Sequence, residues 1–239
     1  MAVLRVQNLT IAHQRTIIEP FDWQVNAGEK WAVLGANGAG KSSLLHALLG
    51  IERSALAQVF YNEQTLKNLS AASQARQRVW VPQRYDEPFT VTVRNALSSI
   101  GAVDIEQHLC EFGLQTQHNA WVHELSGGER QRLTWAMAAA RHTSDTQLWL
   151  LDEPLAAQDL AWQHQLLQKL ANLPCAVIAA VHDLNQVAQF ATHVLLLSGG
   201  VAQAGRVDEM MQVDKLSAVY GIQLQQKNDG ASRWWQIIN

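Results

Sequence analysis

Apolar and polar positions alternate near the N-terminus in the way expected of half-buried strands. The alternation covers residues 3–6 and 22–25 and predicts two strands with one face packed against the rest of the protein. Residues 31–34 then form a short apolar run that leads directly into a glycine-rich segment. Helical spacing follows over residues 41–49, and Gly50 is suited to end that helix. The first fifty residues therefore predict two paired strands, a buried strand and a helix.

Four further apolar runs have the length of buried strands. They alternate with segments of helical spacing, such as residues 160–170. Strands that alternate with helices are typical of an α/β fold, in which helices cover both faces of a mainly parallel sheet. We therefore predict one central sheet, to which the N-terminal strands add a small antiparallel β subdomain. The four runs cover residues 79–81, 148–151, 176–181 and 194–197.

Two regions depart from this alternation. From about residue 84 to 135 the chain carries helical periodicity, over 91–99 and 105–112, without a convincing strand. We predict a helical lobe inserted into the core. Residues 206–239 predict a small C-terminal extension with a short helix and a final strand near residues 233–238. A length of 239 residues fits one domain that carries such a lobe.

Charge is sparse in this chain. Charged residues make up 16% of the sequence, whereas about 25% is usual. A large core and a surface covered by partner proteins both explain this, and composition does not separate them. The formal net charge of −3 lacks the basic footprint of nucleic-acid binding, so no nucleic-acid partner is expected.

The sequence carries no cysteine motif and no membrane segment. Cys110 and Cys175 lie far apart and are expected to be free thiols in a reducing compartment. The N-terminus lacks the basic-then-apolar pattern of a signal peptide. The longest apolar runs fall short of the roughly 20 residues that span a bilayer. If the protein serves a membrane, we expect it to do so through another subunit.

Residues 35–42 fit the phosphate-binding pattern G-x-x-x-x-G-K-[ST] in full. Its glycines let backbone N–H groups curl around phosphate oxygens, and the following helix directs its positive end at the same anion. Lys41 supplies a positive charge for the β- and γ-phosphates, and Ser42 supplies a hydroxyl ligand for Mg²⁺. A plain glycine turn is the alternative, but the strand before and the helix after favour nucleotide binding. The expected nucleotide contacts are Gly35, Ala36, Asn37, Gly38, Ala39, Gly40, Lys41, Ser42 and Ser43.

An apolar run that ends in two carboxylates follows at residues 148–153. Asp152, at the end of the strand, is suited to the oxygen shell that Mg²⁺ prefers. Side chains alternate along a strand, so we expect Glu153 to point away from Asp152 and to face the attacking water as base or orienter. Many strands end in acids, and the pattern gains weight from the phosphate-binding loop before it.

The segment Leu125-Ser126-Gly127-Gly128-Glu129 stands before a predicted helix that runs to about Arg141. Such a helix start is suited to bind a second anion, although an ordinary serine cap is the alternative. The segment closely resembles the signature motif of ATP-binding cassette (ABC) proteins, and with the two motifs above the resemblance covers nearly the whole chain. It implies that Ser126, Gly127 and Gly128 bind the γ-phosphate of an ATP held by a second copy of the chain.

The resemblance assigns three more residues. Gln83, just after a predicted strand, matches the glutamine that contacts Mg²⁺ or the attacking water and signals to membrane subunits. Asp159 matches the aspartate that signals across the dimer. His182 matches the histidine near the γ-phosphate. The implied catalytic residues are Glu153, His182, Gln83 and Lys41, and the implied Mg²⁺ ligands are Ser42, Gln83 and Asp152.

Two features differ from the family pattern. An aromatic residue that stacks on adenine often precedes the phosphate-binding loop, and His13 is the nearest candidate here, with a solvated loop histidine as the alternative. The segment before the conserved aspartate usually reads Ser-Ala-Leu-Asp, whereas here it reads Ala156-Ala157-Gln158-Asp159. We expect altered communication between subunits rather than lost hydrolysis.

Several stretches are similar to the ATPases of vitamin B12, ferric siderophore and haem importers: residues 182–185, 194–197 and 216–221. The resemblance implies two copies beneath two transmembrane permease subunits at the cytoplasmic face of the inner or plasma membrane, fed indirectly by a solute-binding protein. A helix of the permease is then expected to dock in a cleft along residues 84–89, with Tyr85 and Phe89 as apolar anchors.

Other ATPases remain as alternatives. An exporter ATPase would share every motif and differ in its partners. A soluble ABC ATPase of DNA repair would carry a long coiled-coil insertion between Lys41 and Ser126, and the stretch between them is too short to hold one. A translation ATPase would usually hold two cassettes, and a generic kinase or GTPase would lack the signature segment.

Overall fold

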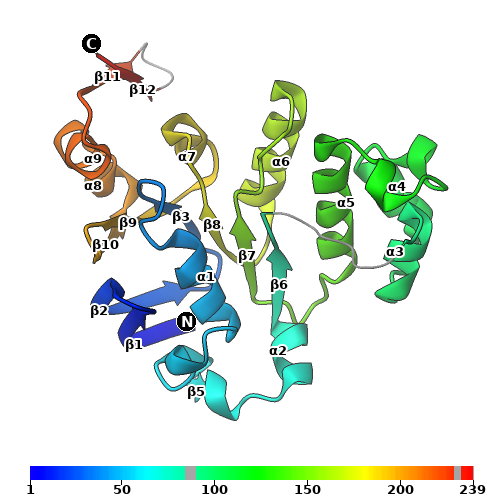
Figure 1. The fold of residues 1–239 in the computed structure, drawn as a ribbon, viewed down its shortest axis with the longest axis horizontal. Coiled ribbons are helices and arrows are strands. Elements are labelled where there is room, and N and C mark those ends of the chain that lie inside the picture. The colour runs from blue at the N-terminus through cyan, green and yellow to red at the C-terminus, as the bar shows by residue number, and fades with distance from the viewer. Residues whose placement is uncertain (84–89, 229–232, 239) are drawn as a thin grey trace.

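Two sheets form the body of the protein (Figure 1), in a computed structural model that describes residues 1–83, 90–228 and 233–238. The first sheet is antiparallel, with strand order β2-β1-β4-β5. The predicted N-terminal pair is confirmed, and its strands are longer than the alternation indicated. The short strands β4 and β5 were not predicted. The four strands are β1 (Ala2–Ala12), β2 (Thr16–Asn26), β4 (Val59–Tyr61) and β5 (Gln64–Thr65).

The second sheet has six strands in the order β10-β9-β3-β8-β7-β6. Five of them run parallel, and β10 pairs antiparallel with β9. The mainly parallel sheet is thus confirmed. The edge strand β10 escaped prediction because its sequence, VAQAGR, has few strand-forming residues. The strands are β3 (Lys30–Leu34), β6 (Arg78–Val81), β7 (Leu148–Asp152), β8 (Ala176–Ala180), β9 (His193–Ser198) and β10 (Val201–Arg206).

Side-chain alternation along the central strands divides the core into two halves. In β3, Trp31 and Val33 pack with the antiparallel sheet and helix α1 (Lys41–Leu49), while Ala32 and Leu34 pack with the helices on the other face. Each face of the sheet is therefore covered, as an α/β fold requires. Helices α6 (Leu160–Asn172) and α7 (Leu184–Phe190) join the second half.

A group of helices lies beyond β6, on the right of Figure 1. Its buried residues, among them Leu97, Leu109 and Leu133, belong to the same core half as α6. Residues 84–89, where the lobe was predicted to begin and the cleft to lie, with Tyr85 and Phe89, are outside the described residues, so the lobe boundaries and the cleft remain predictions. The helices are α3 (Val93–Ser99), α4 (Ile105–Glu111) and α5 (Gly127–Ala140), with short 3-10 turns at Gln115–Gln117 and Val122–Glu124.

Smaller elements complete the chain. The C-terminal extension contains the predicted last strand, and β11 pairs antiparallel with it. Its β12 is tied to the core, because the Trp235 backbone N–H donates to Asn185 Oδ1 over 2.9 Å. No helix within the described ranges is long and apolar enough to cross a membrane. The remaining elements are the turns Arg53–Ala55 and Leu66–Asn68, α2 (Ala71–Gln77), α8 (Val207–Met210), α9 (Val213–Tyr220), β11 (Leu224–Asn228) and β12 (Arg233–Ile237).

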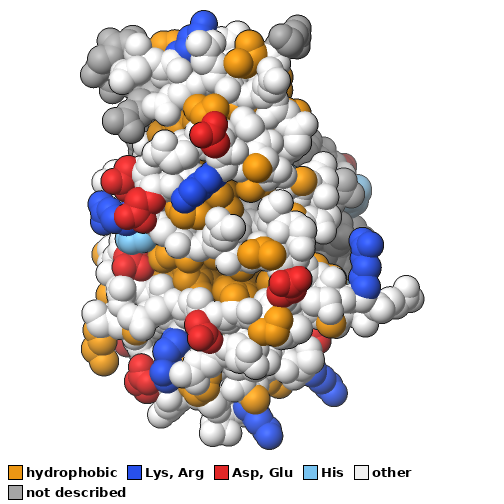
Figure 2. Space-filling model, turned by 90° about the vertical axis from the view of Figure 1, so that its left-hand side faces the viewer, with side chains coloured by type: hydrophobic (Ala, Val, Ile, Leu, Met, Phe, Trp, Pro, Cys, Tyr) orange, Lys and Arg blue, Asp and Glu red, His pale blue; other side chains and the backbone are white. Residues whose placement is uncertain are grey.

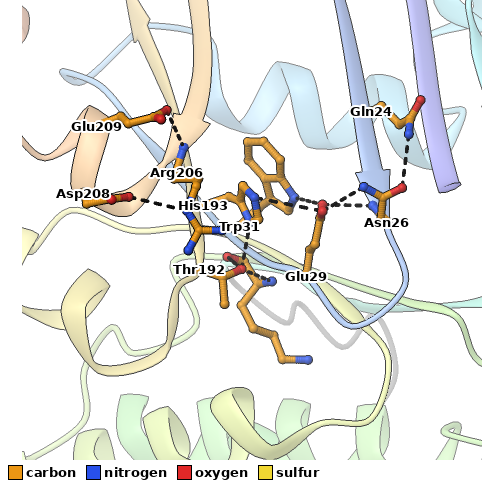
Figure 3. A network of polar contacts seen from close by, with 10 residues as sticks. Gln24, Asn26, Glu29, Trp31, Thr192, His193, Arg206, Asp208 and Glu209 are labelled. Carbon is orange, nitrogen blue, oxygen red and sulfur yellow. Dashed lines mark hydrogen bonds and ion pairs between the residues drawn. The ribbon is translucent and has the colours of Figure 1, made fainter. Parts of the chain in front are cut away.

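A polar network fixes the junction between β2 and β3 (Figure 3). The Glu29 carboxylate accepts hydrogen bonds from the backbone and side-chain nitrogens of Asn26, at 2.9 and 2.8 Å, and from Trp31 Nε1 at 2.9 Å. Burial alone would raise the pKa of Glu29, but these hydrogen bonds outweigh it and lower that pKa. The Trp31 ring also stacks on His193, with ring centroids 4.7 Å apart. The network holds β3 in the register that carries the glycine-rich loop.

The surface mixes charged and apolar side chains. Figure 2 shows acidic and basic groups lying among one another on the face of β10, β2 and α9, with apolar side chains gathered near its middle. Elsewhere Leu160 is 84% exposed and Val103 is 74% exposed. Both explanations of the low charge content therefore keep support, since the chain has a large core and an apolar part to its surface. Cys110 and Cys175 are free thiols.

Candidate active site

A cavity of about 770 Å³ lies where the loops after the central strands meet the start of α1. Parallel strands bring their carboxyl ends to one edge of a sheet, so segments far apart in sequence converge there. A cavity of this size suits a nucleotide. Its lining residues are Ile17, Asn37, Gly38, Gly40, Lys41, Ser42, Ser43, Gln83, Glu153 and His182.

The glycine-rich loop fits its surroundings closely. A Cβ on Gly35 would lie 2.5 Å from the Leu197 carbonyl oxygen, and one on Gly40 would lie 2.8 Å from Ile17 Cγ2. Gly40 also has a φ of 101°, which disfavours any other residue. It precedes α1 and provides no side-chain cap. The first N–H groups of the nine-residue helix α1 therefore remain available to an anion in the cavity.

Lys41 is buried, with an exposed fraction of 6%. Its Nζ donates to the carbonyl oxygens of Gly35 at 2.8 Å and Ala36 at 3.2 Å. Burial lowers the pKa of Lys41, and the carboxylates of Glu153 and Asp152 partly oppose that shift. Within the described residues, the ammonium thus donates its hydrogen bonds to neutral carbonyl oxygens, although it lines a cavity that can hold an anion.

Asp152 ends β7 and is only 4% exposed. Burial raises the pKa of its carboxyl, while a hydrogen bond from Ser42 acts in the opposite direction. Among the described residues Asp152 Oδ1 has no hydrogen-bond partner. A buried carboxylate oxygen without a partner, next to a serine hydroxyl, fits a hard cation such as Mg²⁺, which is usually held by one or two carboxylates together with substrate phosphates.

Glu153 lies between two nitrogen donors. Gln83 Nε2 donates to its Oε2 over 2.8 Å, and His182 Nε2 contacts its Oε1. The three residues come from the ends of β6, β7 and β8, so the sheet brings them together. A carboxylate held by a glutamine and a histidine at the edge of a cavity can orient a water molecule or accept its proton.

The prediction that side-chain alternation along a strand separates Glu153 from Asp152 is wrong. Strand alternation does not apply, because β7 ends at Asp152. Glu153 instead has a φ of 47°, a left-handed conformation. That conformation typically costs about 1–3 kcal/mol in a non-glycine residue and is found at functional sites. This backbone reversal places the Glu153 carboxylate between Gln83 and His182.

The segment of Ser126, Gly127 and Gly128 is not part of the lining of this cavity. It begins α5 with a capping box: Ser126 Oγ accepts from the Glu129 N–H at 3.3 Å, and Ser126 donates from N and Oγ to Glu129 Oε2 at 2.9 and 2.7 Å. Ser126 and Gly127 are exposed. The helix start therefore faces outward, where it is accessible to another molecule.

Asp159 is exposed and caps α6 by accepting the Trp162 N–H at 2.9 Å. The neighbouring Gln158 is buried, with an exposed fraction of 8%. Its Nε2 donates to the Gly128 carbonyl oxygen over 2.9 Å. The segment that departs from the family pattern therefore contacts the signature segment of the same chain. Sequence patterns gave no sign of this contact.

His13 lies in the turn between β1 and β2, with its Nδ1 3.8 Å from Glu52 Oε2 and its side chain 57% exposed. It is not among the lining residues of the cavity, whereas Ile17, in β2, is. Its stacking on adenine stays a prediction. Ile17 was missed because an isoleucine in an alternating strand gives no signal beyond burial.

Comparisons with known proteins agree with this geometry. Residues 18–156 match the ABC transporter family model. The chain is 36% identical to the vitamin B12 import ATP-binding protein BtuD of Vibrio vulnificus, over 84% of this chain and 88% of that protein. It is 34% identical to the hemin import ATP-binding protein HmuV of Photobacterium profundum, over 87% of this chain and 80% of that one.

A solved structure of an inward-facing metal-chelate type ABC transporter superposes with a TM-score of 0.78 and 27% identity. The match covers all of this chain and 97% of the matched chain of that structure. The chain belongs to the ABC transporter family of ATP-binding proteins.

Proposed function

We propose that this chain is the ATP-hydrolysing subunit of an ABC importer that takes up a cobalamin, haem or iron-chelate substrate. The observation that carries the ATPase function is the convergence of Lys41, Glu153 and His182 on one nucleotide-sized cavity. The import function rests on the similarity to the vitamin B12 and hemin import proteins. The ATPase does not contact the cargo, so its residues leave the cargo class open among these three.

The phosphates of ATP would lie over the start of α1. The free N–H groups of the loop and the Lys41 ammonium are placed to neutralise them. Ser42, Asp152 and Gln83 would hold Mg²⁺, which neutralises developing charge on the phosphoryl oxygens. Positioning and charge neutralisation supply most of the catalysis in phosphoryl transfer.

Glu153 would position the attacking water, and His182 would contact the γ-phosphate. Their hydrogen bond closes one side of the cavity. Gln83 holds the other carboxylate oxygen, so the attacking water, His182 and Gln83 would meet at one carboxylate. This arrangement supports the role of Gln83 as the residue that reports the state of the site.

Two copies would face each other head to tail. Ser126, Gly127 and Gly128 of one copy would bind the γ-phosphate held by the other, because they face outward from their own cavity. Asp159 is exposed, and Leu160 beside it is 84% exposed, as expected of a segment that contacts a second copy. ATP then stabilises the closed dimer, and hydrolysis releases it.

The assembled transporter would contain this dimer beneath two transmembrane permease subunits. It would lie at the cytoplasmic face of the inner or plasma membrane, peripheral to the lipid, and a solute-binding protein would deliver the cargo to the permease. An exporter would need no such delivery. Because the permease is the only contact with the membrane in this arrangement, closure of the ATPase dimer is what moves it.

Loss of the chain should abolish uptake of one of the three cargo classes. The test is deletion of the gene in its host, followed by uptake assays with cobalamin, a ferric siderophore and haem. Wild-type protein should restore the lost uptake, Glu153→Gln should not, and Glu106→Gln should, because Glu106 lies on the distant helix α4. Unchanged uptake of all three would contradict the import function and favour an exporter.

Ile17 is expected to contact the adenine ring. Ile17→Ala should weaken ATP binding about tenfold, the effect of losing one buried apolar side chain, and leave the affinity for tripolyphosphate unchanged. Calorimetric titration of both ligands measures the difference. His13→Ala, titrated in parallel, shows whether His13 also stacks on the base. An equal loss of tripolyphosphate affinity in Ile17→Ala would instead mean that Ile17 supports the loop through Gly40.

A further inference from the structure

The signature segment and the segment of residues 156–159 are bound to each other within one chain. Gln158 Nε2 donates to the Gly128 carbonyl oxygen at 2.9 Å. The backbones also approach closely, because a Cβ on Gly128 would lie 2.9 Å from the Ala157 carbonyl oxygen. Ala157 has a φ of 60°, which turns the chain toward Gly128 at the cost of a left-handed conformation. The contact therefore has defined geometry on both sides.

A second hydrogen bond joins helix α5, which begins in the signature segment, to the chain just before residues 156–159. Trp135 lies further along α5, and its Nε1 donates to the Pro154 carbonyl oxygen over 2.9 Å in the buried core. Helix α5 is thus attached to the chain after Glu153 at two places. Gly128, in its first turn, is bound by Gln158, and Trp135, further along the helix, is bound to Pro154. With two attachment points, α5 cannot rotate freely relative to the residues between Glu153 and Asp159.

The Gln158 bond contributes little to folding. Gln158 is 8% exposed, and its Oε1 is buried without a hydrogen-bond partner among the described residues. A buried unpaired acceptor is destabilising. The Gly128 carbonyl, as part of a helix, also has the amide four residues further on as a partner. An apolar side chain of the same size would therefore be tolerated, which separates an effect on function from an effect on stability.

We propose that Gln158 is a positioning residue, which fixes the signature segment Ser126–Gly127–Gly128 relative to Asp159 so that one copy presents both to the nucleotide of the other as a single unit. This rests on the proposed function, in which these segments complete the site of the partner. Gln158 itself is buried and acts through Gly128. Because of this bond, the signature segment and Asp159 would move together.

The test compares Gln158→Met with Gln168→Met. Gln168 is an exposed glutamine on α6, the helix that follows Gln158, is hydrogen-bonded to His164, and serves as the control. In single chains without nucleotide, hydrogen exchange over residues 122–132 should become about threefold to tenfold faster in Gln158→Met only, as expected for the loss of one neutral hydrogen bond. The melting temperature should stay the same or rise.

In the Glu153→Gln background, ATP-dependent dimerisation should weaken about tenfold with Gln158→Met, because each dimer contains the bond twice. The kcat of the variant with Glu153 intact should fall, while the affinity of one site for ATP stays unchanged. Equal exchange and equal kcat in wild type and Gln158→Met would overturn the proposal. So would a lowered melting temperature that alone accounts for the lost activity.

The two proposals fail in different ways. If the wild-type chain does not hydrolyse ATP and the Glu153→Gln variant does not dimerise with ATP, the proposed function fails. Hydrogen exchange in single chains does not depend on dimerisation, so it still decides whether Gln158 holds the signature segment. Unchanged exchange there, together with normal hydrolysis in the wild type, would remove Gln158 from the mechanism and leave the function in place.

Discussion

Glu153→Gln is expected to lower the kcat of ATP hydrolysis by at least about a hundredfold, the effect of losing a positioned general base. The Glu153 carboxylate accepts from both Gln83 Nε2 and His182 Nε2. A glutamine side chain has one oxygen and one NH₂ group, so it can satisfy only one of these donors and cannot accept a proton from water. Charge at the phosphates is unchanged, and ATP should still bind.

The trapped nucleotide should also make dimers visible. Light scattering of Glu153→Gln is expected to show a dimer with Mg-ATP and a monomer with Mg-ADP, because only the γ-phosphate joins the two copies in the proposed arrangement. Glu106→Gln is the matched control and should hydrolyse ATP like the wild type. A kcat within threefold of wild type would contradict the role of Glu153, and equal dimerisation with ADP would contradict the role of the γ-phosphate in joining the copies. A monomer with both nucleotides would mean that the isolated chain does not form the closed dimer, and dimerisation would then be measured in the complex with the permease.

The sequence predicted the layout of this site because each motif has a fixed place in a parallel sheet. The loop of residues 35–42, Gln83, residues 152–153 and His182 each follow a predicted strand, and parallel strands end at one edge. The structure brings most of the loop, Gln83, Glu153 and His182 together around one cavity, and Asp152 is hydrogen-bonded to Ser42 of its lining. The central strands were predictable for a similar reason, since strands that are buried on both faces are apolar throughout.

Other features depend on contacts between distant segments and were not predictable. Ile17 lines the cavity only because β2 crosses over the glycine-rich loop. The left-handed backbone of Glu153 gives no sequence signal, because glutamate rarely adopts it. The bond from Gln158 to Gly128 joins a residue just before α6 to the first turn of α5. The edge strand β10 has few strand-forming residues, and β4 and β5, with three and two residues, are too short to show a periodic pattern.

Lys41→Met should abolish most ATP binding without harming the fold. Lys41 is buried, and within the described residues its Nζ donates hydrogen bonds to two neutral carbonyl oxygens. Burial lowers its pKa. A lysine with a lowered pKa binds protons less readily when folded than when unfolded. Its charge therefore costs stability at neutral pH, and this cost is relieved as the pH rises from the lowered folded value toward the ordinary 10.5. Removing the charge should leave the melting temperature of the nucleotide-free protein equal or higher.

The nucleotide should reverse that balance. Phosphate oxygens would give the Lys41 ammonium charged hydrogen-bond acceptors in place of neutral carbonyls, and hydrogen bonds to charged groups correspond to a roughly 10- to 100-fold gain in affinity. Lys41→Met should thus lose this affinity and the rise in melting temperature with Mg-ATP, both measured by titration and thermal unfolding. The matched control is Lys30→Met: Lys30 is buried too and donates to the carbonyls of Leu173 at 2.7 Å and Cys175 at 2.5 Å, but lies outside the cavity. Lys30→Met should bind ATP normally. Equal ATP affinity in Lys41→Met and wild type would show that the buried ammonium serves the loop and not the phosphates.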